Sequence, residues 1–254
     1  MTRIIMSGAC GRMGRVIAGL VNEDKDAEIV AGIDVVEDDT LGFPIFKSIK
    51  DCDVEADAII DFSTPAVLDD ILEYAISKQV PAVMCTTGYT SEQLDSIREA
   101  SKKVAILKSA NMSLGINTII NLLKPASNVF CNNGYDVEIV EQHHHTKLDS
   151  PSGTALALAD AINDATDGRY SYVYDRSDRR MVRPENEIGI SAVRAGTIPG
   201  THDVIFAGPD ELIEIRHIAY SRSIFGKGAI SAAKFLKGRD AGMYDMSDVI
   251  AAMQ

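Results

Sequence analysis

Residues 8–14 have the sequence Gly8-Ala9-Cys10-Gly11-Arg12-Met13-Gly14. This glycine loop follows a short apolar run, Arg3–Met6, and precedes Arg12–Asn22, where apolar residues recur at helical spacing. We therefore expect a tight turn between a strand and a helix. Glycines at such a turn let the backbone approach a pyrophosphate, and the helix N-terminus offers free N–H groups and a partial positive charge. The spacing is G-x-x-G-x-x-G rather than G-x-G-x-x-G, so the hypothesis of a dinucleotide site depends on the strand–turn–helix setting.

An acidic residue supports the same hypothesis. Asp34 ends a second predicted strand, Glu28–Asp34, and its carboxylate would accept hydrogen bonds from the adenine-ribose hydroxyls of a dinucleotide. Asp34 would also repel the 2′-phosphate of NADP(H), and Val35 after it carries no charge that could bind one. The local chemistry therefore favours NAD(H) over NADP(H), although Arg12 could still reach a phosphate. The alternative is an ordinary tight turn followed by a solvated aspartate.

The segment 1–111 alternates between strand-like and helical patterns, which predicts a parallel sheet with right-handed crossovers. The further strands expected are Ala58–Phe62, Pro81–Cys85 and Val104–Leu107, and the further helices are Pro65–Lys78 and Thr90–Lys102, the second opened by a capping box. Ligands bind at the carboxyl ends of the strands in such a sheet. The turns Asp61–Thr64 and Cys85–Gly88 should then line the nicotinamide half of the dinucleotide site, and ordinary turns are the alternative.

The pattern changes after Asn111. We expect helices at Ser113–Leu123, Thr154–Ile162 and Gly228–Leu236, and strands at Tyr135–Glu141, Ile188–Val193, His202–Phe206 and Glu211–Ile218. Few helices separate these strands, which indicates an antiparallel or mixed sheet. The expected fold class is α/β plus α+β: a Rossmann-type parallel-sheet domain with a second domain built on a mixed sheet. We place the dinucleotide-binding domain at 1–111, the second domain at 112–221 and a return to the first domain at 222–254.

The composition excludes several classes of protein. The 254 residues carry a formal net charge of −12, which argues against a nucleic-acid or anionic-membrane partner because neither would be attracted. No apolar run reaches ~18 residues, so we expect no membrane span. The apolar stretch at the start is too short for a secretory signal. Four widely spaced cysteines without a C-x-x-C pair suit a reducing compartment, and we expect a cytoplasmic protein.

Three of the five histidines stand in a row at His143–His145, followed by Lys147 and then Asp149-Ser150-Pro151-Ser152-Gly153-Thr154-Ala155. A metal site is one interpretation of this run, but two observations argue against it. Side chains alternate along a strand, so three adjacent histidines cannot all face one metal ion, and no carboxylate or cysteine stands at a familiar ligand spacing. A polar surface loop is a second interpretation. We favour acid–base and anion chemistry, because histidine titrates near neutral pH and Lys147 adds a fixed cation. The N–H groups and hydroxyls of Ser152–Thr154, at a helix N-terminus, would form a carboxylate site.

The sequence resembles the 4-hydroxy-tetrahydrodipicolinate reductase family, also called dihydrodipicolinate reductases, over nearly the whole chain. The motifs that carry the resemblance are Gly8–Gly14, Thr86-Thr87-Gly88, Asn111–Asn117, His143–Ala155, Val193–Gly196 and Ala219–Arg222. The resemblance implies NAD(P)H-dependent reduction of 4-hydroxy-tetrahydrodipicolinate to tetrahydrodipicolinate, with loss of water, in lysine biosynthesis through diaminopimelate. It also implies a homotetramer joined through the sheet of domain 112–221, which would be the substrate-binding and oligomerisation domain.

The resemblance further implies roles for individual residues. His143 would donate a proton, and Lys147 would be a second donor that also binds the substrate. The substrate carboxylates would be held by His144, Gly153 and Thr154 together with Lys147. The cofactor, NADH in preference to NADPH by the argument on Asp34, would contact Gly8, Ala9, Cys10, Gly11, Arg12, Met13, Asp34, Cys85, Thr86, Thr87, Ser109, Ala110, Asn111 and Met112. No metal site is expected.

Two other functions fit parts of the pattern. One is a different two-domain dehydrogenase acting on another carboxylate, and the His143–Thr154 stretch argues against it. The other is a non-catalytic dinucleotide-sensing protein whose histidines form a surface metal or partner site. Consumption of NADH in the presence of a chelator separates these hypotheses, because turnover excludes the sensor and insensitivity to the chelator excludes the metal.

Overall fold

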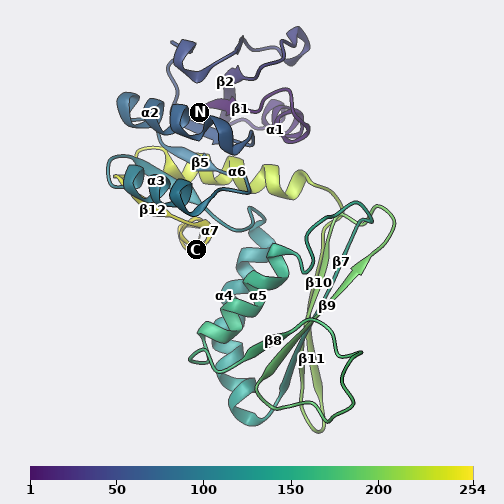
Figure 1. Ribbon diagram of the computed structural model, residues 1–254. Coiled ribbons are helices and arrows are strands. Elements are labelled where there is room, and N and C mark those ends of the chain that lie inside the picture. The colour runs from purple at the N-terminus through teal and green to yellow at the C-terminus, as the bar shows by residue number, and fades with distance from the viewer. Residues whose placement is uncertain (254) are drawn as a thin grey trace. The chain divides into compact units, whose positions relative to one another are not determined.

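The computed structural model describes residues 1–253, which form two compact units. Unit 1 combines Met1–Leu114 with the segment that begins at Arg222, and unit 2 is Gly115–Ser221. The colours of Figure 1 show the same division, since the purple start and the yellow end of the chain share one unit. Unit 2 is therefore an insertion in the sequence of unit 1.

Unit 1 is built on a seven-stranded sheet with the order β12-β6-β5-β4-β1-β2-β3, in which every neighbouring pair is parallel. The strands are β1 (Thr2–Ser7), β2 (Ala27–Ile33), β3 (Ile45–Phe46), β4 (Ala58–Asp61), β5 (Ala82–Met84), β6 (Ala105–Lys108) and β12 (Gly242–Tyr244). The helices are α1 (Arg12–Asn22), α2 (Leu68–Lys78), α3 (Ser91–Ser101), α6 (Ser223–Leu236) and α7 (Met246–Ala251), with short 3₁₀ turns at Asp39–Leu41, Ile49–Asp51 and Pro65–Val67. The predicted Rossmann-type parallel sheet is confirmed.

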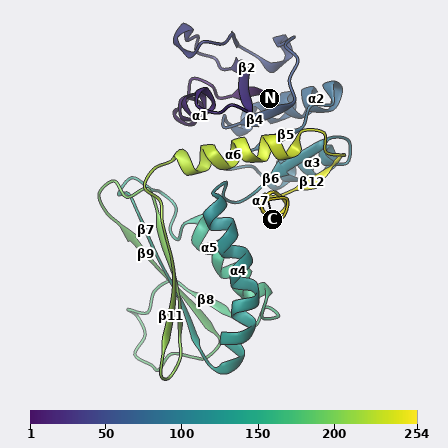
Figure 2. The ribbon, with the colours of Figure 1, turned by 180° about the vertical axis from the view of Figure 1, so that it is seen from behind.

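Helices cover both faces of this sheet, as Figures 1 and 2 show. Side chains alternate along a strand, so Ile4 and Met6 of β1 join a core with α1 and α6, whereas Ile5 packs with α2 and α3 on the other face. Burial on both faces explains the uninterrupted apolar run Ala58–Ile60 in β4. Because the strands are parallel, their carboxyl ends lie at one edge of the sheet.

Unit 2 is built on a five-stranded mixed sheet with the order β11-β10-β7-β9-β8. The strands are β7 (Asp136–His143), β8 (Ser171–Val173), β9 (Glu187–Arg194), β10 (Thr201–Ala207) and β11 (Leu212–Ile218). The pairs β7/β9 and β8/β9 are parallel, and β10 runs antiparallel to both β7 and β11. The predicted mixed sheet is confirmed.

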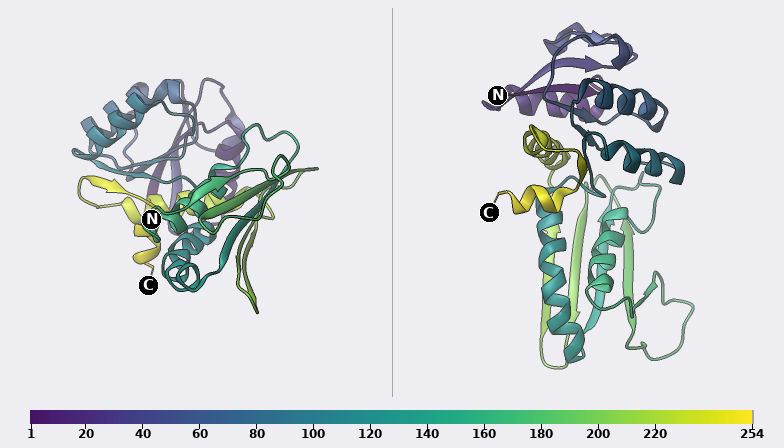
Figure 3. Two further views of the ribbon diagram at one scale, coloured as in Figure 1. Left: turned by 60° about the horizontal axis from the view of Figure 1, so that its bottom comes forward. Right: turned by 90° about the vertical axis from the view of Figure 1, so that its left-hand side faces the viewer.

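Two helices, α4 (Leu114–Phe130) and α5 (Gly153–Asp164), cover one face of this mixed sheet, as the views of Figure 3 show. Helix α4 extends beyond the predicted end at Leu123. It continues through Pro125, a residue that usually ends or kinks a helix, and a 3₁₀ turn at Cys131–Asn133 follows it. Among residues 1–253, no helix is both long and apolar enough to cross a membrane.

Candidate active site

The glycine loop connects β1 to α1 in a conformation that needs its glycines. Gly8 has a φ of +80°, and a Cβ there would lie 2.6 Å from the Phe62 carbonyl oxygen. A Cβ at Gly14 would lie 2.3 Å from the carbonyl oxygens of both Ala9 and Gly8. The loop therefore packs backbone against backbone. Of the described side chains, none caps Gly11 at the start of α1, and none in the first turn is acidic. This helix terminus suits an anion such as a pyrophosphate.

Asp34 follows β2 and touches the glycine loop directly. Its Oδ2 accepts a hydrogen bond from Cys10 N at 2.9 Å, and its Oδ1 accepts one from Val36 N at 3.1 Å. A carboxylate has about four lone-pair sites, so Asp34 retains capacity for ribose hydroxyls while it braces the loop. The bracing role was not predicted, because nothing in the sequence shows that Cys10 and Asp34 meet.

The other predicted cofactor residues follow neighbouring strands of the same sheet. Cys85–Thr87 comes directly after β5, and Ser109–Met112 comes directly after β6. Between β1 and β5 lies β4, whose last residue Asp61 is buried and accepts hydrogen bonds from Ser63 N at 3.2 Å and from the Tyr89 hydroxyl at 3.3 Å. The strand pairing therefore gathers the predicted cofactor residues at one edge of unit 1, as a dinucleotide site requires. The glycine cradle, the uncapped helix terminus and Asp34 fit this group.

In unit 2, the helix-covered face of the sheet changes from apolar to polar along β7. Val137 and Ile139 belong to the core, whereas Glu141 and His143 follow on the same face by strand alternation. Glu141 has no exposed surface, and His143 is also buried. The polar end of the sheet lies beside Ser152, the N-cap of α5.

Glu141 accepts four hydrogen bonds from three residues. Its Oε2 contacts His143 Nδ1 at 2.6 Å and Arg194 Nη1 at 2.8 Å, and its Oε1 contacts Arg194 Nη2 at 2.7 Å and Ser152 N at 2.9 Å. Burial alone would raise the pKa of Glu141, but the bonds from His143 and Arg194 lower it to about 2. Glu141 is thus an ionised, acceptor-only carboxylate at neutral pH.

The Glu141 carboxylate determines how the His143 ring can act. Since Glu141 can only accept, His143 Nδ1 must carry a hydrogen, and Nε2 is the nitrogen left for acid–base chemistry. A Cβ at Gly200 would lie 3.0 Å from His143 Nε2, and Gly200 has a φ of +156°. Glycine at this position keeps space beside Nε2.

His202 of β10 lies against the same ring, with its centroid 5.1 Å from that of His143. Its Nε2 contacts Ser152 Oγ at 3.1 Å. Burial, and then the proximity of His143, lower the pKa of His202 to about 3, so this ring is neutral at ordinary pH. Sequence reasoning missed His202, because only the register of β10 places it opposite Glu141.

The other two histidines of the cluster point to different partners. His144 Nδ1 contacts Thr146 Oγ1 at 2.7 Å, and His145 Nδ1 contacts the Gly196 carbonyl oxygen at 2.8 Å. The three neighbouring rings therefore do not converge, in agreement with strand alternation. Within the described part of the chain, no group of three or more His, Cys, Asp or Glu side chains is arranged to hold a metal ion.

The remaining predicted substrate residues lie in the loop after β7 and at the start of α5. Lys147 Nζ pairs with Asp149 Oδ1 at 2.8 Å. Gly153 and Thr154 begin α5, whose N-cap Ser152 accepts from Ala155 N at 3.1 Å. All four predicted substrate residues thus belong to unit 2, whereas every predicted cofactor residue belongs to unit 1.

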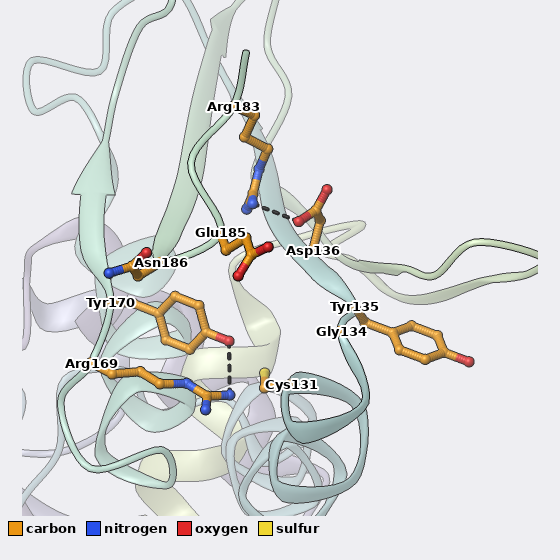
Figure 4. Close-up of a pocket in the computed structure, with 9 residues that line it drawn as sticks. All are labelled: Cys131, Gly134, Tyr135, Asp136, Arg169, Tyr170, Arg183, Glu185 and Asn186. Carbon is orange, nitrogen blue, oxygen red and sulfur yellow. Dashed lines mark hydrogen bonds and ion pairs between the residues drawn. The ribbon is translucent and has the colours of Figure 1, made fainter.

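A separate pocket of about 480 Å³ lies at the other end of β7 (Figure 4). Arg183 and Asp136 form an ion pair at its wall, with Nη1 2.6 Å from Oδ1, and Arg169 bonds the Tyr170 hydroxyl at 3.1 Å. Asp136 is the first residue of β7 and His143 is the last, so the two ends are about 23 Å apart at ~3.3 Å per residue. This pocket contains none of the predicted site residues.

Comparison with known proteins gives a consistent result over both units. The family model described as dihydrodipicolinate reductase, N-terminus, matches residues 2–112, and the model described as dihydrodipicolinate reductase, C-terminus, matches residues 115–250. A 4-hydroxy-tetrahydrodipicolinate reductase of Clostridium novyi (strain NT) is 48% identical over 251 residues, which are 98% of each chain. Its counterpart in Caldanaerobacter subterraneus subsp. tengcongensis is 48% identical over 250 residues, again 98% of each chain.

Solved structures share the fold. The dipicolinate-bound dihydrodipicolinate reductase from Paenisporosarcina sp. TG-14 has a TM-score of 0.79 at 23% identity, covering 96% of this chain and 97% of that chain. A probable dehydrogenase from Thermotoga maritima has a TM-score of 0.62 at 14% identity, covering 99% of this chain and 93% of that chain.

Proposed function

The chain belongs to the dihydrodipicolinate reductase family of NAD(P)H-dependent oxidoreductases, and we propose that His143 donates the proton in its reaction, the reduction of 4-hydroxy-tetrahydrodipicolinate in lysine biosynthesis. The observation that carries this proposal is the contact of His143 Nδ1 with the buried Glu141 carboxylate. It commits Nδ1 to an internal acceptor and leaves Nε2 to give a proton to a ligand.

The substrate is a dicarboxylate, and the loop after His143 offers groups that bind carboxylates. The Lys147 ammonium would exchange its partner Asp149 for a substrate carboxylate and would serve as a second proton donor. Gly153 and Thr154 would offer N–H groups at the positive end of α5, and His144 would add a further donor. Fixing both carboxylates orients the ring, and such orientation contributes several kcal/mol to a rate acceleration, up to about 7–11 kcal/mol in the best cases.

The reaction needs one hydride and one proton after the 4-hydroxyl has left as water. Bound NAD(P)H supplies the hydride. The ring electrons then move toward the imine nitrogen, and the proton held on His143 Nε2 completes the reduction. Unit 1 would hold the cofactor through Gly8–Met13, Asp34, Cys85–Thr87 and Ser109–Met112.

The test of this function is the consumption of NADH by the purified protein when freshly prepared 4-hydroxy-tetrahydrodipicolinate is added with a chelator. We expect turnover that the chelator does not change. Absence of turnover with either nicotinamide cofactor contradicts the proposed reaction, and loss of turnover on chelation contradicts the metal-free chemistry.

We further propose that NADH is the preferred cofactor, because acidic side chains follow β2. Glu37 and Asp38 come after Asp34 along the chain but are paired with Lys47 and Arg15, so Asp34 is the carboxylate that would oppose a 2′-phosphate most. Replacing Asp34 with alanine removes hydrogen bonds to the ribose, which are worth about 1.5–3 kcal/mol for a charged acceptor. We therefore expect NADH affinity to fall about 10- to 100-fold, and NADPH affinity to fall less.

The matched control for this change is Glu37→Ala. Glu37 carries the same charge but pairs with the exposed Lys47, so its loss should leave NADH affinity within about twofold. Dissociation constants from fluorescence titration of both cofactors give the result. Equal losses of NADH and NADPH affinity in the Asp34 variant contradict the proposed preference.

We also propose a cytoplasmic homotetramer that assembles through the uncovered face of the mixed sheet. Helices α4 and α5 cover the other face, while Leu212, Ile218 and Val193 expose 59%, 46% and 43% of their surfaces. By the strand register the same face also carries the charged Asp203, Glu214 and Arg216, so the exposed apolar side chains would be one part of a mixed surface that assembly buries. A solution mass of four chains supports the proposal, and a monomer mass contradicts it.

The cysteines support the proposed cytoplasmic location. All four are free thiols, which suits the reducing cytoplasm.

A further inference from the structure

In the proposed reaction Glu141 neither binds the substrate nor gives up a proton, yet at the polar end of unit 2 it accepts hydrogen bonds from three residues. Each oxygen accepts two bonds: Oε2 from His143 and Arg194, and Oε1 from Arg194 and Ser152. A carboxylate without exposed surface costs several kcal/mol of desolvation unless it is paired in this way. These four bonds fix the positions of the three residues that donate them.

We infer that Glu141 and Arg194 are positioning residues for this reaction: the carboxylate holds the His143 ring by Nδ1 so that Nε2 presents the proton, and the guanidinium fixes the plane of the carboxylate. The inference rests on the proposed role of His143. Neither residue needs to touch the substrate. Arg194 stands opposite His143 in the β7/β9 register and binds both oxygens in a bidentate fork, the geometry that constrains a carboxylate most.

The same carboxylate also aligns the proposed anion site with the proton donor. Its Oε1 accepts from Ser152 N, the N-cap of α5, while Arg194 Nη2 donates to the Asp149 carbonyl oxygen at 2.8 Å. The loop from β7 to α5 is thus tied at both places to one buried ion pair. A shift of Glu141 would move the His143 ring and the start of α5 together.

An acceptor-only partner is what a proton donor of this kind requires. Before transfer the imidazolium has hydrogens on both nitrogens, and after transfer the neutral ring retains the one on Nδ1. An ionised Glu141 accepts from Nδ1 in both states. Glutamine has only one acceptor oxygen, so at least two of the four donors lose their acceptor whichever way the amide turns. If the NH₂ group of the glutamine faces Nδ1, two N–H donors meet and the imidazolium has no acceptor there.

The test is Glu141→Gln, with Arg194→Lys as the second variant should the first fail to fold. We expect kcat for NADH oxidation to fall about 10²-fold or more, within the range of about 10²–10⁴ that a general acid supplies, and KM for the substrate to change much less. The falling limb of kcat against pH should move to lower pH, because an opposite charge beside the imidazolium has gone. An unmoved limb in a folded Glu141→Gln variant overturns the inference. Should that variant fail to fold, an unchanged kcat in Arg194→Lys, which keeps the charge but loses the bidentate fork, overturns it instead.

Other groups near the ring bear on this pH profile. The titratable or charged side chains that face His143 or its neighbour His202 are Glu141 on β7, Lys147 in the loop, Arg194 on β9, His202 on β10 and His217 on β11. Burial, and then the proximity of His143, lower the pKa of His202 to about 3, so this ring stays neutral, and burial also lowers the pKa of His217. A limb that moves on replacement of Glu141, and that is absent from the His143→Gln variant, is assigned to the His143 proton rather than to Lys147.

A double-mutant cycle separates positioning from a structural role and from failure of the proposed function. In a His143→Gln background, Glu141→Gln should lower kcat by clearly less than it does in the parent, since the part of its effect that passes through the ring is already lost. Fully additive losses overturn the inference. Full activity of the His143 variant alone refutes the proposed function instead.

Asp57→Asn is the matched control for loss of an ion-paired carboxylate. Asp57 lies in unit 1, accepts from Arg3 N at 2.8 Å and pairs with Lys237 at 3.0 Å. Its pKa, like that of Glu141, is lowered to about 2: burial opposes this shift, and the bonds from Arg3 produce it. We expect a lower thermal midpoint for this variant and an unmoved pH limb. A limb that moves equally in Asp57→Asn overturns the inference.

Discussion

Replacing His143 with glutamine lowers kcat about 10²–10⁴-fold, the contribution typical of a positioned general acid, while KM for the substrate changes only modestly. Glutamine keeps a donor near Glu141 and much of the ring's volume, so the buried Glu141–Arg194 pair stays satisfied. The variant loses only the titratable nitrogen. Steady-state kinetics with NADH at fixed pH measure both parameters.

His145→Gln is the control for this variant. His145 belongs to the same run of histidines, but it is exposed and its Nδ1 bonds the Gly196 carbonyl. We expect its kcat to remain within about threefold of the parent, as for surface substitutions that leave the site intact. A His143 variant with full turnover, or two variants with equal losses, removes His143 from the mechanism.

Replacing Gly14 with alanine should abolish tight NADH binding and lower the midpoint of thermal unfolding. The added Cβ would lie 2.3 Å from two backbone carbonyl oxygens, of Gly8 and Ala9, so the glycine loop and α1 must move apart. Overpacking of this kind costs about 1–3 kcal/mol, and more where backbone rather than side chain must shift. Thermal unfolding and NADH titration measure the two effects.

Gly19→Ala provides the comparison within the same helix. Nothing lies within 4 Å of a Cβ at Gly19, and this residue is exposed in the middle of α1. Alanine there should stabilise the protein by about 0.5–1 kcal/mol and leave NADH affinity unchanged. A Gly14 variant that is as stable as the parent and binds NADH equally well contradicts the packing argument.

Much of unit 1 could be predicted because its signals are local. The alternation of apolar strands and amphipathic helices gave the parallel sheet, and the capping box at Thr90 and Gln93 is present with both of its bonds. The edge strands β3 and β12 have only two and three residues, too few for a period to be recognised. The short helix α7 was missed for the same reason.

The candidate site was predicted only in part, because its connections cross the sheet. The run of histidines pointed to His143, since three titratable rings in succession are unusual. Arg194, which bonds Glu141, lies 53 residues beyond it in the chain, and His202 contacts Ser152 across 50 residues. Those contacts depend on the pairing of β7 with β9 and β10, which periodicity cannot supply. Glu141 was expected only as the last residue of a strand, because its burial follows from strand alternation in the finished sheet.

The insertion of unit 2 into the sequence of unit 1 has a consequence for biosynthesis on the ribosome. Helix α6 contributes Ala229, Ala233 and Leu236 to one core of unit 1, and these residues are translated more than 100 positions after Leu114. A nascent chain must therefore carry an uncovered apolar sheet face while the whole of unit 2 is being made. Unit 2 has its own core and can fold first. Synthesis from the N-terminus therefore favours the inserted unit and leaves the outer one exposed to aggregation and chaperones until α6 has been made.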